Sequence, residues 1–141
     1  MAQPKNEDSE RLARLRKAAK NEPISSFLDT RLIKLSHGYA KVSMKLRPEY
    51  QTFNGFIFGG IIMAVADQAF AYGSNSVITP NIAVQFNIHL VDKAEPSDKL
   101  IAECHVVREG KRFCVSEITV HNQSGKLIAA ATGTTIPVPK Q

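Results

Sequence analysis

Hydrophobic and polar residues alternate over much of this chain. Between Ile82 and Leu90 every second residue is apolar, a period of two that is typical of a β-strand with one buried face. Residues 39–47 alternate in the same way, and residues 31–36 precede them across a His37-Gly38 turn, which predicts a hairpin. Turns at Glu109-Gly110 and at residues 122–125 separate the remaining predicted strands, which cover residues 99–107, 111–121 and 126–138.

The segment from Gly59 to about Asn75 breaks this alternation. Its apolar residues are too densely spaced for a half-buried strand, and its alanines, methionine and glutamine favour a helix. Apolar residues fall on all sides of this helix, so we expect it to be buried on most sides. The predicted fold is α+β: an antiparallel sheet of about six strands wrapped around one long helix. Such an apolar helix needs more cover than one small sheet provides, which favours a dimer.

The first 22 residues have a different character. They carry charges of both signs and only a thin apolar stripe, so we expect a helical or frayed lead that Pro23 interrupts. Residues 23–141 then form a single domain, as the length of 141 residues also indicates. The lead has no apolar core of a secretory signal, and no run reaches the ~18 apolar residues of a membrane helix. We therefore expect a soluble cytoplasmic protein without a membrane partner.

The formal net charge is +5, with basic residues concentrated in the lead and at Arg108, Lys111 and Arg112. A solvated basic surface and a site for an anionic small molecule both fit this modest excess. Nucleic acid is not expected, because no basic stripe is interleaved with aromatic residues. Cys104 and Cys114 flank a predicted hairpin, where they face each other or remain buried free thiols; a cytoplasmic chain favours free thiols. No histidine or cysteine spacing indicates a metal site.

Two features of the central helix carry candidate chemistry. Gly59 and Gly60 lie at its N-terminus, where unpaired N–H groups and the helix dipole can polarise a carbonyl oxygen and stabilise an oxyanion. These glycines also have a simpler explanation, the tight turn into the helix. Asp67 is the only charged residue between positions 54 and 70. A buried carboxylate needs a partner or a polar pocket, so we expect Asp67 to face a cleft.

A narrow stripe of small and polar side chains supports that cleft. On a helix it comprises Ala64, Asp67, Gln68, Ala71 and Asn75. A carboxylate facing a cleft can act as a general base toward water or as a nucleophile. Gln68 is a candidate for orienting substrate or water, as are Gln85 and Asn87, although a structural polar role is the favoured explanation for each.

These residues resemble a known family. NGFIFGG followed by IIMAVADQAFAY is similar to the central segment of hotdog-fold acyl-CoA thioesterases of the phenylacetate-degradation (PaaI-like) type. The resemblance covers residues 30 to about 137. It implies a homodimer, often a homotetramer, with active sites at the subunit interface. The substrate class is an acyl-CoA with a small, medium-chain or aryl acyl group; coenzyme A is then part of the substrate, and no separate cofactor is implied.

Residue by residue, the resemblance implies a shared site. Gly59 offers its backbone N–H to the thioester carbonyl, and Asp67 of the neighbouring subunit is the base or nucleophile. Asn54, Phe58, Gly60 and Gln68 lie around the substrate. The basic residues of the hairpin, Arg108, Lys111 and Arg112, meet the phosphates of coenzyme A.

The sequence departs from the family at three places. Phe58 replaces the usual histidine, the preceding loop is about two residues shorter so that Thr52 competes with Asn54 for the loop position, and Ala83 stands where relatives carry a hydroxyl. NGFIFGG also resembles NGDIFGG of a second hotdog hydrolase group, whose catalytic aspartate corresponds to Phe56. These departures keep a non-catalytic acyl-CoA-binding module as an alternative. A hotdog dehydratase is a weaker one, because His37 is the nearest histidine before the helix.

Overall fold

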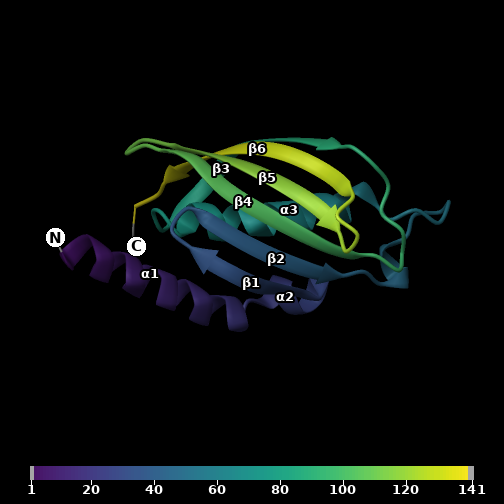
Figure 1. Cartoon of the computed structure of the whole chain (residues 1–141), viewed down its shortest axis with the longest axis horizontal. Helices are drawn as coiled ribbons and strands as arrows, with labels where there is room; N and C mark the ends of the chain where they lie inside the picture. The colour runs from purple at the N-terminus through teal and green to yellow at the C-terminus, as the bar shows by residue number, and fades with distance from the viewer. Residues whose placement is uncertain (1, 140–141) are drawn as a thin grey trace.

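A six-stranded antiparallel sheet curves around one long helix, α3 (Figure 1). The computed structural model describes residues 2–139, and side chains from residue 6 onward. Three helices, one short 3-10 turn and six strands follow one another along the chain: α1 Ala2–Lys20, α2 Pro23–Leu28, β1 Thr30–Ser36, β2 Tyr39–Lys45, η1 Pro48–Tyr50, α3 Gly59–Asn75, β3 Asn81–Leu90, β4 Lys99–Glu109, β5 Cys114–Asn122 and β6 Leu127–Pro137. The predicted architecture of one helix against six antiparallel strands is confirmed.

The core lies between the concave face of the sheet and α3. The largest completely buried side chains are Phe70, Met44, Leu100, Ile118 and Ile128. Phe70 stacks on Phe86 with ring centroids 5.6 Å apart, which fixes the middle of α3 over β3. Gly133 of β6 lies under the same ring; a Cβ there would be 2.5 Å from Cζ of Phe70, so only glycine allows this approach.

The two edge strands differ in their surroundings. The strand order is β1-β2-β4-β5-β6-β3, so β1 and β3 have one unpaired edge each. Helices α1 and α2 lie beside β1 (Figure 1), whereas β3 packs on α3, through Phe86 and Leu90. Ile82, Val84 and Leu90 of β3 are 52%, 54% and 45% exposed. The strand itself is confirmed, but its expected buried face is only partly covered within one chain, by the packing of Phe86 and Ile88.

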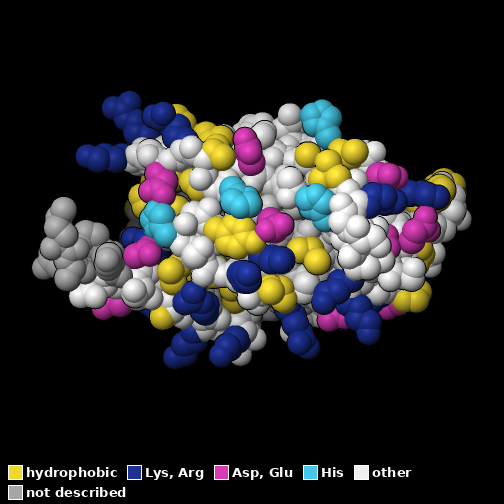
Figure 2. Space-filling view, viewed as in Figure 1, with side chains coloured by type: hydrophobic (Ala, Val, Ile, Leu, Met, Phe, Trp, Pro, Cys, Tyr) yellow, Lys and Arg dark blue, Asp and Glu magenta, His cyan; other side chains and the backbone are white. Residues whose placement is uncertain are grey.

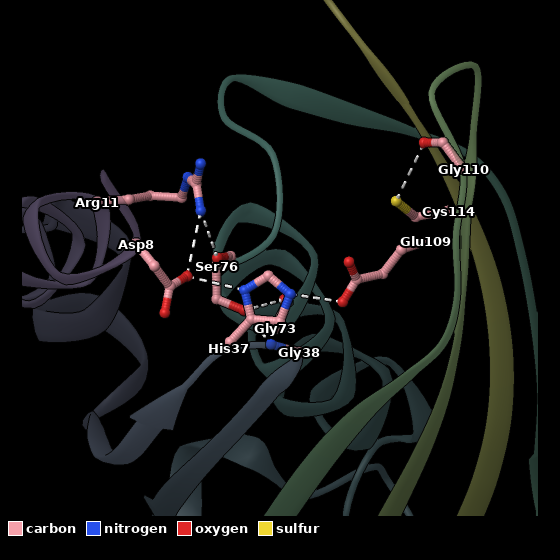
Figure 3. A network of polar contacts seen from close by, with 9 residues as sticks. All are labelled: Asp8, Arg11, His37, Gly38, Gly73, Ser76, Glu109, Gly110 and Cys114. Atoms are coloured by element: carbon pink, nitrogen blue, oxygen red, sulfur yellow. Dashed lines mark hydrogen bonds and ion pairs between the residues drawn. The ribbon is translucent and has the colours of Figure 1, made fainter. Parts of the chain in front are cut away.

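A polar network joins α1 to the body of the fold (Figure 3). Nδ1 of His37 lies 2.7 Å from Oδ1 of Asp8 on α1, and Nε2 lies 2.5 Å from Oε1 of Glu109 at the end of β4. Arg11 reaches both Asp8 and the carbonyl oxygen of Ser76. Because both ring nitrogens of His37 face carboxylates, the arrangement is fully satisfied only when the imidazole is protonated.

Two smaller expectations need correction or refinement. β5 begins at Cys114 rather than at residue 111, because the turn after Gly110 takes up residues 110–113. Cys104 pairs in register with Ile118, and Cys114 pairs with Glu109, so the cysteines do not face each other. Both are buried free thiols, as favoured. None of the described helices is long and apolar enough to cross a membrane.

Candidate active site

The N-terminus of α3 presents free backbone donors. Phe58 is the N-cap residue, and its carbonyl accepts from the N–H of Ile61. The N–H groups of Gly59 and Gly60 have no acceptor among the described residues. A Cβ on Gly59 would be 2.9 Å from Cδ1 of Leu90, so the helix begins against the end of β3. Unpaired amides at a helix N-terminus can hold an oxyanion.

The loop before α3 places Asn54 and Phe58 at the surface. Asn54 accepts a hydrogen bond from the Thr52 hydroxyl, so the two residues that competed for the family's loop position touch each other. Gly55 has φ +85°, which closes the turn between them and Phe56. Phe58 is 58% exposed, and its ring lies over Gly60, with Cε2 2.5 Å from where a Cβ would be. An aromatic ring therefore occupies the space beside the free amides.

Asp67 lies on the uncovered face of α3. We expect Asp67 to face a cleft, and within one chain it lies on an open surface: Met63, Asp67 and Ala71, spaced four residues apart, are all exposed. Asp67 forms no hydrogen bond or ion pair within the part of the chain that the structure describes. Although part of the side chain is exposed, neighbouring atoms partly desolvate its carboxyl group, and this desolvation raises the pKa of Asp67. A carboxylate with a raised pKa and no structural partner is a functional-site candidate.

Gln68 lies on a different side of α3 from Asp67 and faces α2. Its amide nitrogen donates to Oε1 of Glu22 at 2.9 Å and to Oγ of Ser25 at 2.6 Å. Tyr72 donates to the same Glu22 oxygen at 2.7 Å, and burial together with that carboxylate raises the pKa of Tyr72 to about 12. Gln68 is 93% buried, so the structure uses it to fasten α2 to α3 rather than to line the face around Asp67.

The basic hairpin is at the opposite end of α3 from its glycines. Arg108, Lys111 and Arg112 are exposed, and the Arg108 guanidinium lies 5.0 Å from the centroid of the Phe113 ring. The turn beside this hairpin contacts the C-terminal end of α3, because the Gly38 N–H donates to Oγ of Ser76. Within one chain the hairpin and the Gly59 amide are therefore not brought together.

Gly59 and Asp67 are eight residues apart, about 12 Å along the helix axis at 1.5 Å per residue. One carbonyl group cannot contact both within a single chain. The structure thus brings together Gly59, Gly60, Phe58 and Asn54, and leaves Asp67 separate on the same open face. Sequence reasoning missed Glu22, Ser25 and Tyr72, which form the clamp on Gln68; no local motif marks that clamp, because Glu22 and Gln68 are 46 positions apart.

Comparison with known proteins identifies the family. The model of the thioesterase superfamily matches residues 54–129, from the loop through α3 into β6. A protein from Archaeoglobus fulgidus that carries an esterase name is 36% identical over 115 residues, 82% of this chain and 75% of that protein. The chain belongs to the thioesterase superfamily.

Further similarities place it more closely. The acyl-coenzyme A thioesterase PaaI of Escherichia coli is 28% identical over 113 residues, 80% of this chain and 81% of its own length. The structure of that protein superposes with a TM-score of 0.89 at 25% identity and covers 94% of this chain and 97% of its own. This thioesterase is therefore a PaaI-like hotdog protein and a thioester hydrolase.

Proposed function

We propose that this thioesterase hydrolyses an acyl-CoA to the free acid and coenzyme A, with Gly59 and Asp67 as its catalytic groups. The observation that carries the proposal is the open face of α3, where the Gly59 and Gly60 amides and the Asp67 carboxylate have no partner among the residues that the structure describes. The name of the E. coli relative, an acyl-coenzyme A thioesterase, supports the substrate class.

The chemistry follows from these two groups. The N–H of Gly59 polarises the thioester carbonyl and stabilises the oxyanion that forms on attack. Asp67, in its ionised form, takes a proton from the attacking water, or attacks the carbonyl carbon itself to give an anhydride that water then hydrolyses. In either route the C–S bond breaks, and the thiolate of coenzyme A leaves and takes up a proton.

A two-fold dimer would complete the site. If the β3 edges of two copies lie antiparallel, their α3 helices also run antiparallel, so Gly59 of one chain approaches Asp67 of the other. Such a dimer covers the exposed Ile82 and Val84 of β3. It also brings the basic hairpin of one chain toward the other chain's Gly59, because the β5 start and the β3 start lie at the same end of the sheet.

The other proposed substrate contacts fall into two groups, one for the phosphates of coenzyme A and one for the acyl group. Arg108, Lys111 and Arg112 would meet the phosphates of coenzyme A, where exposed cations are favourable. Phe58 and Asn54 would lie at the mouth of the acyl site, next to Gly60. The protein works, in this proposal, as a homodimer or a homotetramer in the cytoplasm.

A thiol-release assay tests the proposal. The purified protein is given short, medium, long and aryl acyl-CoA esters, and free coenzyme A is measured with a thiol reagent. Release that depends on Asp67 supports an acyl-CoA thioesterase and identifies the acyl preference. Binding of acyl-CoA by calorimetry without thiol release over hours would instead favour the non-catalytic alternative.

A further inference from the structure

A hollow lies on the opposite side of the molecule from β3. It has a volume of about 490 Å³ and runs between the last turns of α1, helix α2 and the edge strand β1. This volume is within the range of small-molecule sites. No residue of α3 lines it, so it is separate from the proposed active site.

Four cations surround this hollow: Arg16, Lys20, Arg31 and Lys34. Lys20, Arg31 and Lys34 form no ion pair with any described carboxylate. The one carboxylate in the lining, Asp29, is already paired, with its Oδ2 3.6 Å from Nη2 of Arg47. Figure 2 shows Lys and Arg side chains gathered along the lower rim of the view, where α1 and β1 lie in Figure 1. The hollow therefore has an excess of uncompensated positive charge.

A buried hydroxyl without a partner lies in the same lining. Thr30 is only 6% exposed, and its Oγ1 has no hydrogen-bond partner among the described residues. Because this oxygen is closed to solvent and Thr30 pairs in register with the core residue Met44, its side chain faces the core rather than the hollow. Ser26 adds an exposed hydroxyl to the lining.

Residues of α1 and β1 that contact each other or the core form the walls of the hollow. Arg16 of the lining joins α1 to β1, because its Nη2 donates to the carbonyl oxygen of Leu35 at 2.7 Å. Ala19 on α1 and Leu32 on β1 pack against the core and give the hollow an apolar wall. Ile33 is 49% exposed beside them. A ligand that carries both negative charge and an apolar part matches these walls.

We propose that this hollow, the α1–β1 site, binds a small organic phosphate with at least two negative charges. Arg31, Lys34 and Lys20 would neutralise the phosphate oxygens, the exposed hydroxyl of Ser26 would donate to one of them, and the apolar wall would contact the organic part. The proposal does not depend on the proposed function, because it uses none of the residues assigned to hydrolysis.

Titration calorimetry with inorganic pyrophosphate and with ADP tests the site on the full chain. We expect both to bind at the α1–β1 site, with ADP tighter because of its base, and binding to weaken as salt rises. The double variant Arg31→Gln/Lys34→Gln should weaken ADP at least about tenfold. The control Arg14→Gln/Lys17→Gln removes the same charge from α1 outside the hollow and should leave ADP affinity within about twofold, since screening limits distant charges.

Amide NMR shifts locate the ligand independently of affinity. Shifts at Thr30, Arg31 and Lys34 on adding ADP support the proposal. Shifts confined to Gly59 and the 108–112 hairpin would place ADP in the substrate site and overturn it. Three further results would overturn the proposal. They are an equal loss of ADP affinity in both double variants, pyrophosphate binding as tightly as ADP, and no binding of either compound.

Discussion

At the scale of single residues, Asp67 is exposed and has no hydrogen-bond or ion-pair partner among the described residues. It is the one charged side chain of the 54–70 segment, and the structure leaves it uncovered on α3 instead of neutralising it. Nothing in the fold of one chain needs a carboxylate there. Its replacement therefore separates catalysis from stability.

Asp67→Asn should lower thioester hydrolysis by roughly 10²–10⁴-fold, the usual contribution of a positioned base. The fold should remain, because burial raises the pKa of Asp67 and its ionised form therefore gains no stability from folding. Thiol release measures the first effect and thermal unfolding the second. Full activity in both Asp67→Asn and Asp67→Ala would remove Asp67 from the mechanism.

The raised pKa of Asp67 also predicts a pH profile. The ionised carboxylate is the active form, so kcat/KM should fall as pH falls through a pKa above the ordinary 3.8. The residual activity of Asp67→Asn should lack this acid limb. If the activity of Asp67→Asn falls at low pH in the same way as that of the native protein, the titrating group is not Asp67.

At the scale of elements, close packing of α3 on β4 depends on Gly73. A Cβ there would be 2.5 Å from Sγ and 2.9 Å from Cβ of the completely buried Cys104. Alanine in place of glycine usually stabilises a helix interior by about 1 kcal/mol. Here Gly73→Ala should destabilise the protein by about 1–3 kcal/mol through overpacking, measured by urea unfolding. Adding Cys104→Ala should restore part of the loss; a stabilised Gly73→Ala would contradict this packing.

His37 links α1, the β1–β2 turn and the end of β4. Partial burial lowers its pKa, but hydrogen bonds and charges from Asp8 and Glu109 together raise it above the ordinary 6.5. A pKa raised by folding contributes stability that is fully present below 6.5 and is lost as pH rises through the folded value. The melting temperature of the native protein should fall over that window.

His37→Gln provides the comparison, because it keeps a polar side chain that does not titrate. Its melting temperature should be lower than that of the native protein at pH 6 and should change less between pH 6 and 9. Parallel profiles for the two proteins would show that the network in Figure 3 contributes nothing through protonation.

At the scale of the whole molecule, the two edge strands predict how copies associate. Ile82 on β3 and Ile33 on β1 make a controlled comparison, because they are the same residue type, lie on opposite edges of the sheet and are 52% and 49% exposed. If β3 forms the dimer, Ile82→Glu buries a charge in the interface and should give monomers that hydrolyse as poorly as Asp67→Asn. Ile33→Glu should leave both the oligomeric state and the activity unchanged. Light scattering measures the oligomeric state and thiol release measures the activity. If the Ile82→Glu variant is still a dimer, the β3 edge is not the dimer interface.

Local patterns determined much of the molecule. The helix runs from Gly59 to Asn75 as its dense apolar spacing predicts, and the hairpins follow from alternation and turn residues. These features depend on neighbouring residues, which one sequence displays directly. The glycine-aspartate motif likewise led to the thioesterase family that the comparisons bear out.

Tertiary structure decided what depends on distant contacts. Glu22 and Ser25 take Gln68 away from the open face, the α1–β1 hollow forms only where two segments meet, and Asp67 is exposed because one sheet cannot enclose every side of α3. The pattern of apolar residues along a helix shows which positions are hydrophobic, but it does not show which other helix or strand packs against each of them. The sequence by itself therefore determined the elements and the family, whereas the packing of one element on another decided which side chains remain free for chemistry.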